Sequence, residues 1–206
     1  MPAAVLLEQG RKRVFASVLG WEGWCRSGRD ETAALEALAA YAPRYRVIVE
    51  RAGLDLALEC SFRVVERLAG NATTDFGAPG AVAVAERRGD TAAAGARRRA
   101  LLQAAWDHLD EVVERAPAEL RKGPRGGGRD RDAIASHVVE AEVAYARKLG
   151  VREEDPATRR SLLLEHLSLP SSPQGESATG WPLAYGARRI IWHVLDHAWE
   201  IEDRSA

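Results

Sequence analysis

The feature that most limits the possible folds is a change in sequence texture near residue 90. From there onward, long stretches rich in alanine, leucine and arginine favour helix and lack the alternation of a strand. Helices are predicted over residues 90–115, 130–149, 156–169 and 182–204. Asp155 followed by Pro156 gives the third of them a capping residue and a proline at its first position. Four helices with connections of this size indicate a bundle.

The first half of the chain mixes short β-prone runs with one helical segment. Strands are predicted over residues 14–19, 60–68 and 80–85, where β-branched residues alternate or cluster between turn-rich segments. Between the first two strands, Asp30 caps a single amphipathic helix that ends at Gly53. The predicted fold class is therefore α+β, with a small β-α-β-β unit at 1–88 and a helical bundle at 89–206.

Composition and charge limit which binding partners and which cellular location we expect for this protein. The 206 residues carry a net charge of −1, which argues against a generally basic nucleic-acid binder. The N-terminus lacks the pattern of a signal peptide, and no apolar run is long enough to span a membrane. We therefore expect a cytoplasmic protein without a membrane partner. Cys25 and Cys60 do not have metal-ligand spacing and are interpreted as free thiols.

Two histidines four residues apart form the clearest candidate site. His193 and His197 fall in the predicted last helix, where this spacing separates side chains by about 40° around the axis and about 6 Å along it. Two imidazoles on one face can hold a metal ion, and a third ligand from another helix would leave open positions. His137, among small and apolar residues of the helix at 130–149, is the predicted third ligand.

The same pair also fits a second interpretation, a solvated helix face. The histidine side of this helix carries further polar residues, which are Arg189, Asp196, Glu200 and Arg204. However, Trp192 and Trp199 extend the apolar arc so far that little of the helix is left for solvent. A polar stripe that faces a cavity is therefore favoured.

These histidines resemble the metal triad of the DinB superfamily, metal-binding four-helix bundles that include bacterial thiol S-transferases and maleylpyruvate isomerases. In that family one histidine comes from the second helix and an H-x-x-x-H pair from the fourth. The matching segments are ASHVVEAEVAYARKLG, with His137, and WHVLDHAWEIEDR, with His193 and His197. The resemblance implies a small-molecule substrate and, through the thiol transferases, a low-molecular-weight thiol. Many members continue with Arg-Gly-Gln after the last histidine, whereas this chain continues with Ala198-Trp199-Glu200, which puts the shared substrate in doubt.

A second resemblance lies in the first half. The segment GWCRSGRDETAALEALAAY is similar to the strand-to-helix turn of HicB-like domains, small α/β units known from toxin and antitoxin pairs. It implies a HicB-like segment at 1–88 that contacts a partner.

Basic residues near the histidines are candidates for binding an anionic group of a substrate. Arg121, Arg125 and Arg129 lie in a glycine-rich loop directly before the helix that carries His137. Guanidinium groups beside amides at a helix N-terminus can bind a carboxylate or phosphate, although a flexible basic loop is the simpler interpretation. Arg189, one helical turn before His193, is a further candidate of this kind.

Three other residues are candidates for catalytic roles. His108 is placed by its helical face to support a ligand or act as a general base, or else to be a core histidine. Glu140 and Glu200 each follow a proposed ligand by three residues. Each is a candidate fourth ligand, orienting partner or base, or a surface carboxylate.

The sequence thus predicts a protein that binds zinc, nickel or iron and acts on a small molecule as a hydrolase or thiol transferase, with a homodimer as one possible assembly. The alternative is a non-catalytic binding or regulatory module of HicB-like, stress-response type, in which the metal is structural or absent. A fourth protein ligand would favour that alternative. Nucleic-acid binding through the basic loop is disfavoured because no aromatic residues are interleaved for stacking.

Overall fold

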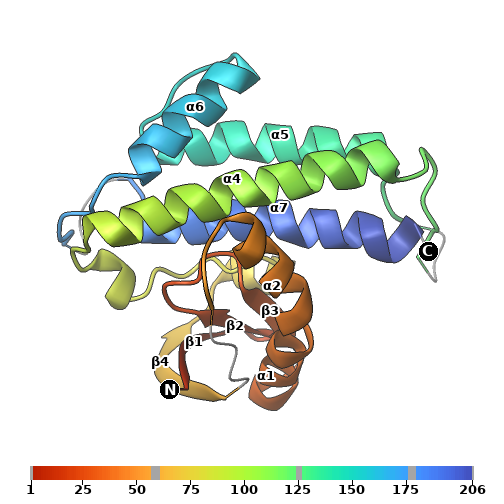
Figure 1. Ribbon diagram of the computed structural model, residues 1–206. Coiled ribbons are helices and arrows are strands. Elements are labelled where there is room, and N and C mark those ends of the chain that lie inside the picture. The colour runs from red at the N-terminus through yellow and green to blue at the C-terminus, as the bar shows by residue number, and fades with distance from the viewer. Residues whose placement is uncertain (1, 57–60, 124–126, 176–179, 206) are drawn as a thin grey trace.

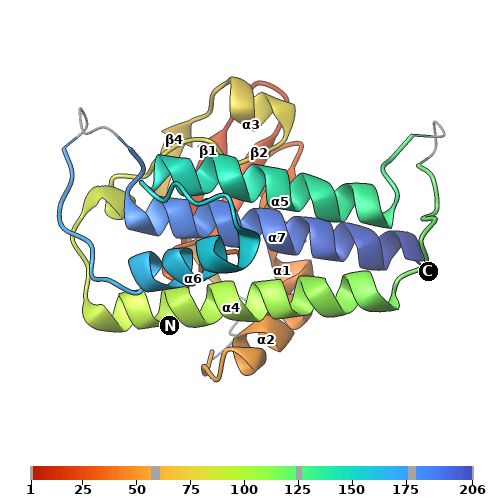
Figure 2. The same cartoon turned by 90° about the horizontal axis from the view of Figure 1, so that it is seen from above.

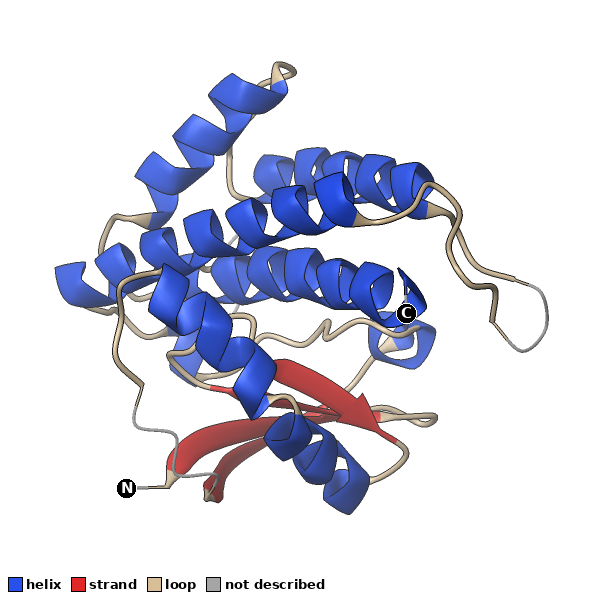
Figure 3. Ribbon diagram, turned by 45° about the vertical axis from the view of Figure 1, so that its right-hand side comes forward, coloured by secondary structure: helices blue, strands red, loops and turns tan. Residues whose placement is uncertain are grey.

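The computed structural model describes residues 2–56, 61–123, 127–175 and 180–205. These residues form a four-stranded sheet, helices that cover it, and a layer of long helices on one side (Figures 1 and 3). The predicted α+β class is confirmed at this level. None of the helices in the described ranges is long and apolar enough to cross a membrane.

The sheet has the strand order β3-β2-β1-β4. Its strands are β1 (Ala3–Gln9), β2 (Val14–Val18), β3 (Cys25–Gly28) and β4 (Phe62–Ala69). β1 pairs antiparallel with β2 and parallel with β4, and β2 pairs antiparallel with β3. A parallel pair needs a long crossover, which α1 (Glu31–Ala40) and α2 (Ala42–Arg51) supply. Asp30 caps α1 as predicted, because its side chain accepts from the amide of Ala33 at 2.8 Å.

The single helix predicted up to Gly53 is wrong in detail, because the chain forms two helices there. The break falls at Tyr41, and Pro43 lies in the first turn of α2. A proline has no amide hydrogen to donate and clashes with the preceding turn, so it favours a helix start over a helix interior. The unit is therefore β-β-β-α-α-β, which corrects the predicted β-α-β-β order.

The strand predicted at 80–85 is also wrong. This segment is irregular and ends in the short 3₁₀ helix η1 (Ala85–Arg87). Its backbone groups bond to side chains instead of a neighbouring strand: Arg188 donates to the carbonyl of Ala81 at 2.8 Å, and the amide of Ala83 donates to Glu86 at 2.8 Å. The turn-rich segment before it contains α3 (Ala72–Phe76). The strand predicted at 60–68 is β4, and Cys60 lies outside the described residues.

The four helices predicted for the second half are present. They are α4 (Ala92–Arg115), α5 (Arg131–Lys148), α6 (Pro156–Leu167) and α7 (Leu183–Ser205). Figure 2 shows α7 between α4 and α5, and α7 contacts both along its length, while the shorter α6 is inclined to them in Figure 1. Asp155 accepts from the amide of Thr158 at 2.8 Å, which confirms the predicted cap of α6.

One continuous hydrophobic core joins the sheet, its covering helices and the long helices. Leu7 of β1, Ile48 of α2, Leu101 of α4 and Ile191 of α7 all belong to it and are almost fully buried. The other face of β2 contributes Phe15, whose ring meets that of Trp192 edge to face at 5.9 Å. The central helix α7 is therefore held from several sides, which fixes the position of the polar residues it carries.

Candidate metal centre

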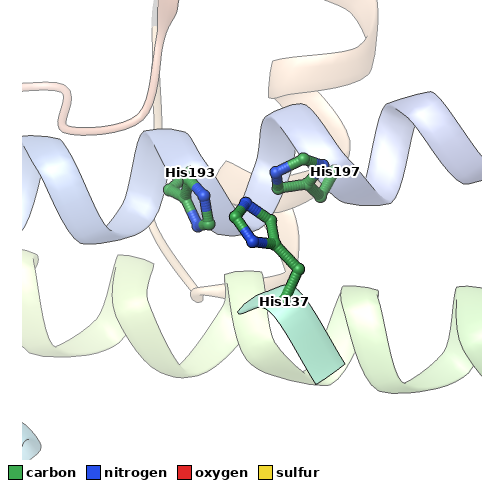
Figure 4. A group of neighbouring side chains, drawn as sticks. All are labelled: His137, His193 and His197. Atoms are coloured by element: carbon green, nitrogen blue, oxygen red, sulfur yellow. The ribbon is translucent and has the colours of Figure 1, made fainter. Parts of the chain in front are cut away.

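Three histidines from two helices converge on one point. His137 comes from α5, and His193 and His197 come from successive turns of α7 (Figure 4). One potential ligand atom of each lies within 4.8 Å of the others. The ring centroids are 5.2 Å apart for His137 and His193, 5.0 Å for His137 and His197, and 4.6 Å for the α7 pair. The three imidazoles are close enough to bind one metal ion, as the sequence predicted.

The convergence follows from helix periodicity and from the way α5 and α7 pack. A spacing of four residues places His193 and His197 on one face of α7. The two helices run in opposite directions, since His137 meets His197 whereas Tyr145, further along α5, meets His193 and Arg189. A residue in the first half of α5 therefore faces the second half of α7.

The site is partly buried, and burial favours the neutral form of two of its histidines, His137 and His193. His193 is 7% exposed, whereas His137 and His197 are half-buried and reach solvent. Burial, followed by the neighbouring His197 and His137, lowers the pKa of His193 to about 2. Burial also lowers the pKa of His137. A neutral imidazole offers a free lone pair, which is the form that binds a metal ion.

Glu200 orients one of the three histidines. Its Oε2 lies 2.9 Å from Nδ1 of His197, and its Oε1 accepts from Nη1 of Arg204 at 2.7 Å. The hydrogen bond with His197 lowers the pKa of the Glu200 carboxyl. An ionised carboxylate only accepts, so Nδ1 of His197 is the donor and Nε2 is left as the ligand atom. Of the three roles predicted for Glu200, this geometry fits the orienting partner.

The other predicted catalytic residues lie apart from the cluster of potential ligands. Glu140 is exposed, three residues along α5 from His137. The Nε2 atom of His108 on α4 lies 3.3 Å from Oε1 of Glu202, so this histidine pairs with a carboxylate outside the triad. Neither belongs to the group of side chains that could share a metal ion in the described ranges.

The four predicted basic residues differ in their positions relative to the site. Arg129 is exposed, but its positive charge helps to lower the pKa values of His137 and His193, so it lies near the site. Arg121 bonds to the end of α7, since its Nη2 donates to the carbonyl of Asp203 at 2.8 Å. Arg125 lies outside the described residues. Arg189 is buried beside the triad.

Sequence reasoning missed Tyr145. Its ring meets that of His193 edge to face at 5.5 Å, and its hydroxyl accepts from Nη2 of Arg189 at 2.9 Å. Tyr145 follows His137 by eight residues, about two helical turns, which places both on similar faces of α5. That spacing is the signal that could have found it.

Comparisons with protein-family models, with curated proteins and with solved structures gave no match to this chain. The functional argument therefore depends on the geometry and chemistry of these side chains.

Proposed function

We propose that this protein binds one divalent transition metal ion through His137, His193 and His197 and acts on a small molecule as a hydrolase or thiol transferase. The observation that carries the proposal is the convergence of three potential ligand atoms within 4.8 Å, from two helices. Imidazole nitrogens suit zinc, nickel and iron. Because burial keeps His193 neutral, no proton has to leave it before a metal binds.

The arrangement of the carboxylates favours an open site over a closed structural one. Three histidines are the only group of potential ligands that the described residues bring together. Both oxygens of Glu200 are engaged, one by His197 and one by Arg204. Sites with three protein ligands keep a position for water or substrate, as catalytic zinc sites do. A metal ion there would supply Lewis-acid activation of a bound water or thiol.

We further infer that α4 to α7 correspond to the four helices of a DinB-like bundle. His137 comes from the second of these helices and the His193/His197 pair from the fourth, which is the order of the family's triad. The packing of α7 between α4 and α5 is in keeping with this assignment. The HicB-like nature of residues 1–88 stays a prediction, and so does the regulatory function that it would imply.

The metal content of untagged protein, measured by plasma mass spectrometry, tests the centre. We expect about one metal ion per chain in the wild type and its loss in His137→Ala, His193→Ala and His197→Ala. His166→Ala is the matched control, since this histidine lies on α6 and outside the cluster. A wild-type protein that stays free of metal after incubation with zinc, nickel and iron would overturn the proposal. The loaded protein is then assayed for hydrolysis and thiol transfer on small electrophiles, with His193→Ala as the inactive reference.

A further inference from the structure

Arg189 is a buried cation with no carboxylate partner among the residues that the structure describes. Its side chain belongs to α7, one turn before His193, and the residue is 5% exposed. Nη2 donates to the hydroxyl of Tyr145 at 2.9 Å, while Nε and Nη1 are buried with no hydrogen-bond partner in the described part of the chain. The guanidinium lies 5.1 Å from the ring centroid of Tyr145 and 5.2 Å from that of Trp192.

The other buried arginines show how this protein normally neutralises such a charge. Each of them bonds to a carboxylate: Arg98 to Asp90, Arg159 to Glu142 and Arg188 to Glu86. An unpaired buried charge is strongly destabilising unless it finds a partner. The cation–π contacts with Tyr145 and Trp192 offset only a part of that cost. Arg189 therefore differs from the other buried arginines, because no carboxylate of the described ranges pairs with it.

The missing anion belongs beside the histidine triad. Arg189 contacts Tyr145, whose ring packs against His193, and the charge of Arg189 also helps to lower the pKa of that histidine. A metal ion at the triad would add two more positive charges to the same region. Glu200 does not balance them, since it already pairs with Arg204. An anionic ligand would compensate both cations at once.

We propose that Arg189, oriented by Tyr145, binds the carboxylate of an anionic small-molecule substrate whose other end reaches the metal. This inference rests on the proposed metal centre and names the class of substrate that the centre accepts. A single buried guanidinium matches a singly charged carboxylate, and charge-assisted hydrogen bonds from Nε and Nη1 would provide the affinity. His137 and His197 are partly exposed, so the proposed metal position itself reaches solvent.

The test uses full-length protein loaded with cobalt(II) and two thiols that differ only in charge, 3-mercaptopropionate and 3-mercaptopropionamide. Both bind cobalt through sulfur, and the thiolate-to-cobalt absorption band reports occupancy without any activity assay. We expect the wild type to prefer the acid by about tenfold, since one charge-assisted contact is worth about that factor. In Arg189→Gln the preference is expected to fall to about twofold. Arg147→Gln removes an exposed arginine two residues after Tyr145 and should keep the wild-type preference.

The possible outcomes distinguish failure of the anion inference from failure of the proposed metal centre. If the wild type takes up no cobalt, the metal centre is overturned and the anion inference with it. If cobalt binds and the preference for the acid is equal in the wild type and Arg189→Gln, only the anion inference is overturned. Circular dichroism checks that each variant folds. If Arg189→Gln does not fold, Tyr145→Phe, which removes only the hydroxyl that contacts Arg189, tests the inference in its place. An expected loss of about threefold in preference supports the inference, and an unchanged preference overturns it.

Discussion

The Nδ1 atom of His197 lies 2.9 Å from Oε2 of Glu200, three residues further along α7. The other oxygen of Glu200 holds Nη1 of Arg204, whose Nε donates to the carbonyl of Arg121 at 2.9 Å. The chain of contacts thus runs from a proposed metal ligand to the segment before α5. A carboxylate that accepts a hydrogen bond from the second nitrogen of a ligating imidazole fixes the tautomer of the ring and makes the ring a stronger metal ligand.

Replacing Glu200 by glutamine is expected to weaken metal binding while leaving the three ligands in place. The amide cannot offer two carboxylate oxygens to His197 and Arg204, so the ring loses its fixed orientation. Loss of such a partner typically costs about 10–100-fold in metal affinity. Competition with a chromophoric chelator measures the dissociation constant for zinc.

Glu140→Gln is the matched control for this measurement. Glu140 also follows a proposed ligand by three residues, but it is exposed and has no place in the cluster. We expect its zinc affinity to stay within about threefold of the wild type, since exposed charges are screened by solvent. Equal losses in both variants would contradict the orienting role of Glu200.

Glu142→Ala is expected to destabilise the helical half strongly. Glu142 of α5 and Arg159 of α6 form an ion pair at 2.9 Å, with side-chain exposures of 2% and 1%. Removing one partner leaves a buried charge uncompensated, which costs about 3–5 kcal/mol. Urea denaturation followed by circular dichroism measures the free energy of unfolding. Glu154→Ala breaks the exposed pair with Arg147 and should cost less than about 1 kcal/mol.

The free energy of unfolding is expected to depend on pH through Glu22. Burial raises the pKa of this carboxyl above its ordinary value of 4.5, although Arg97 and Arg98 act in the opposite direction. Above pH 4.5 the folded state therefore keeps a proton that the unfolded state releases. The stabilisation from this group is present at low pH and is lost as the pH rises through the folded pKa.

Glu22→Gln, which cannot ionise, should therefore be more stable than the wild type at pH 8, with a smaller gain at pH 5. Chemical denaturation at the two pH values measures the difference. Glu36→Gln on the exposed face of α1 provides the control and should show no such change. A gain that is the same at both pH values would contradict the assignment to Glu22.

Local signals made the helices and the histidine face predictable. The caps at Asp30 and Asp155 and the helical spacing of His193 and His197 depend only on nearby residues. β1 escaped prediction because the middle of the strand is buried without alternation, so no period of two marks it. The strand predicted at 80–85 is wrong for a non-local reason. The segment has β-prone residues, but Arg188, 107 residues further along the chain, bonds to the carbonyl of Ala81 in place of a neighbouring strand.

Relationships between helices needed the structure. The helical wheel indicates the inward face of α5, but only the antiparallel packing of α5 and α7 brings His137 to His197. The same packing joins Tyr145 to Arg189, 44 residues apart in sequence. Arg189 is buried with no carboxylate partner in the described part of the chain, and its surroundings come from residues distant in sequence, so no local pattern predicts this.

Gly23→Ala is expected to disturb the packing of the sheet against α7. Gly23 has a φ of +94°, a conformation that an L side chain adopts only with strain. A Cβ atom there would also overlap Cγ2 of Ile191, which lies two residues after Arg189 and two residues before His193. Gly53→Ala is the matched control, since Gly53 has a φ of +67° and open space around a Cβ. The strain alone should cost Gly53→Ala about 1–2 kcal/mol of stability.

Gly23→Ala should lose about 1–3 kcal/mol more through overpacking, and its zinc affinity should fall as α7 shifts. Urea denaturation and the chelator titration measure both effects, and equal stability losses in the two variants would show that Gly23 does not set the distance between the sheet and α7.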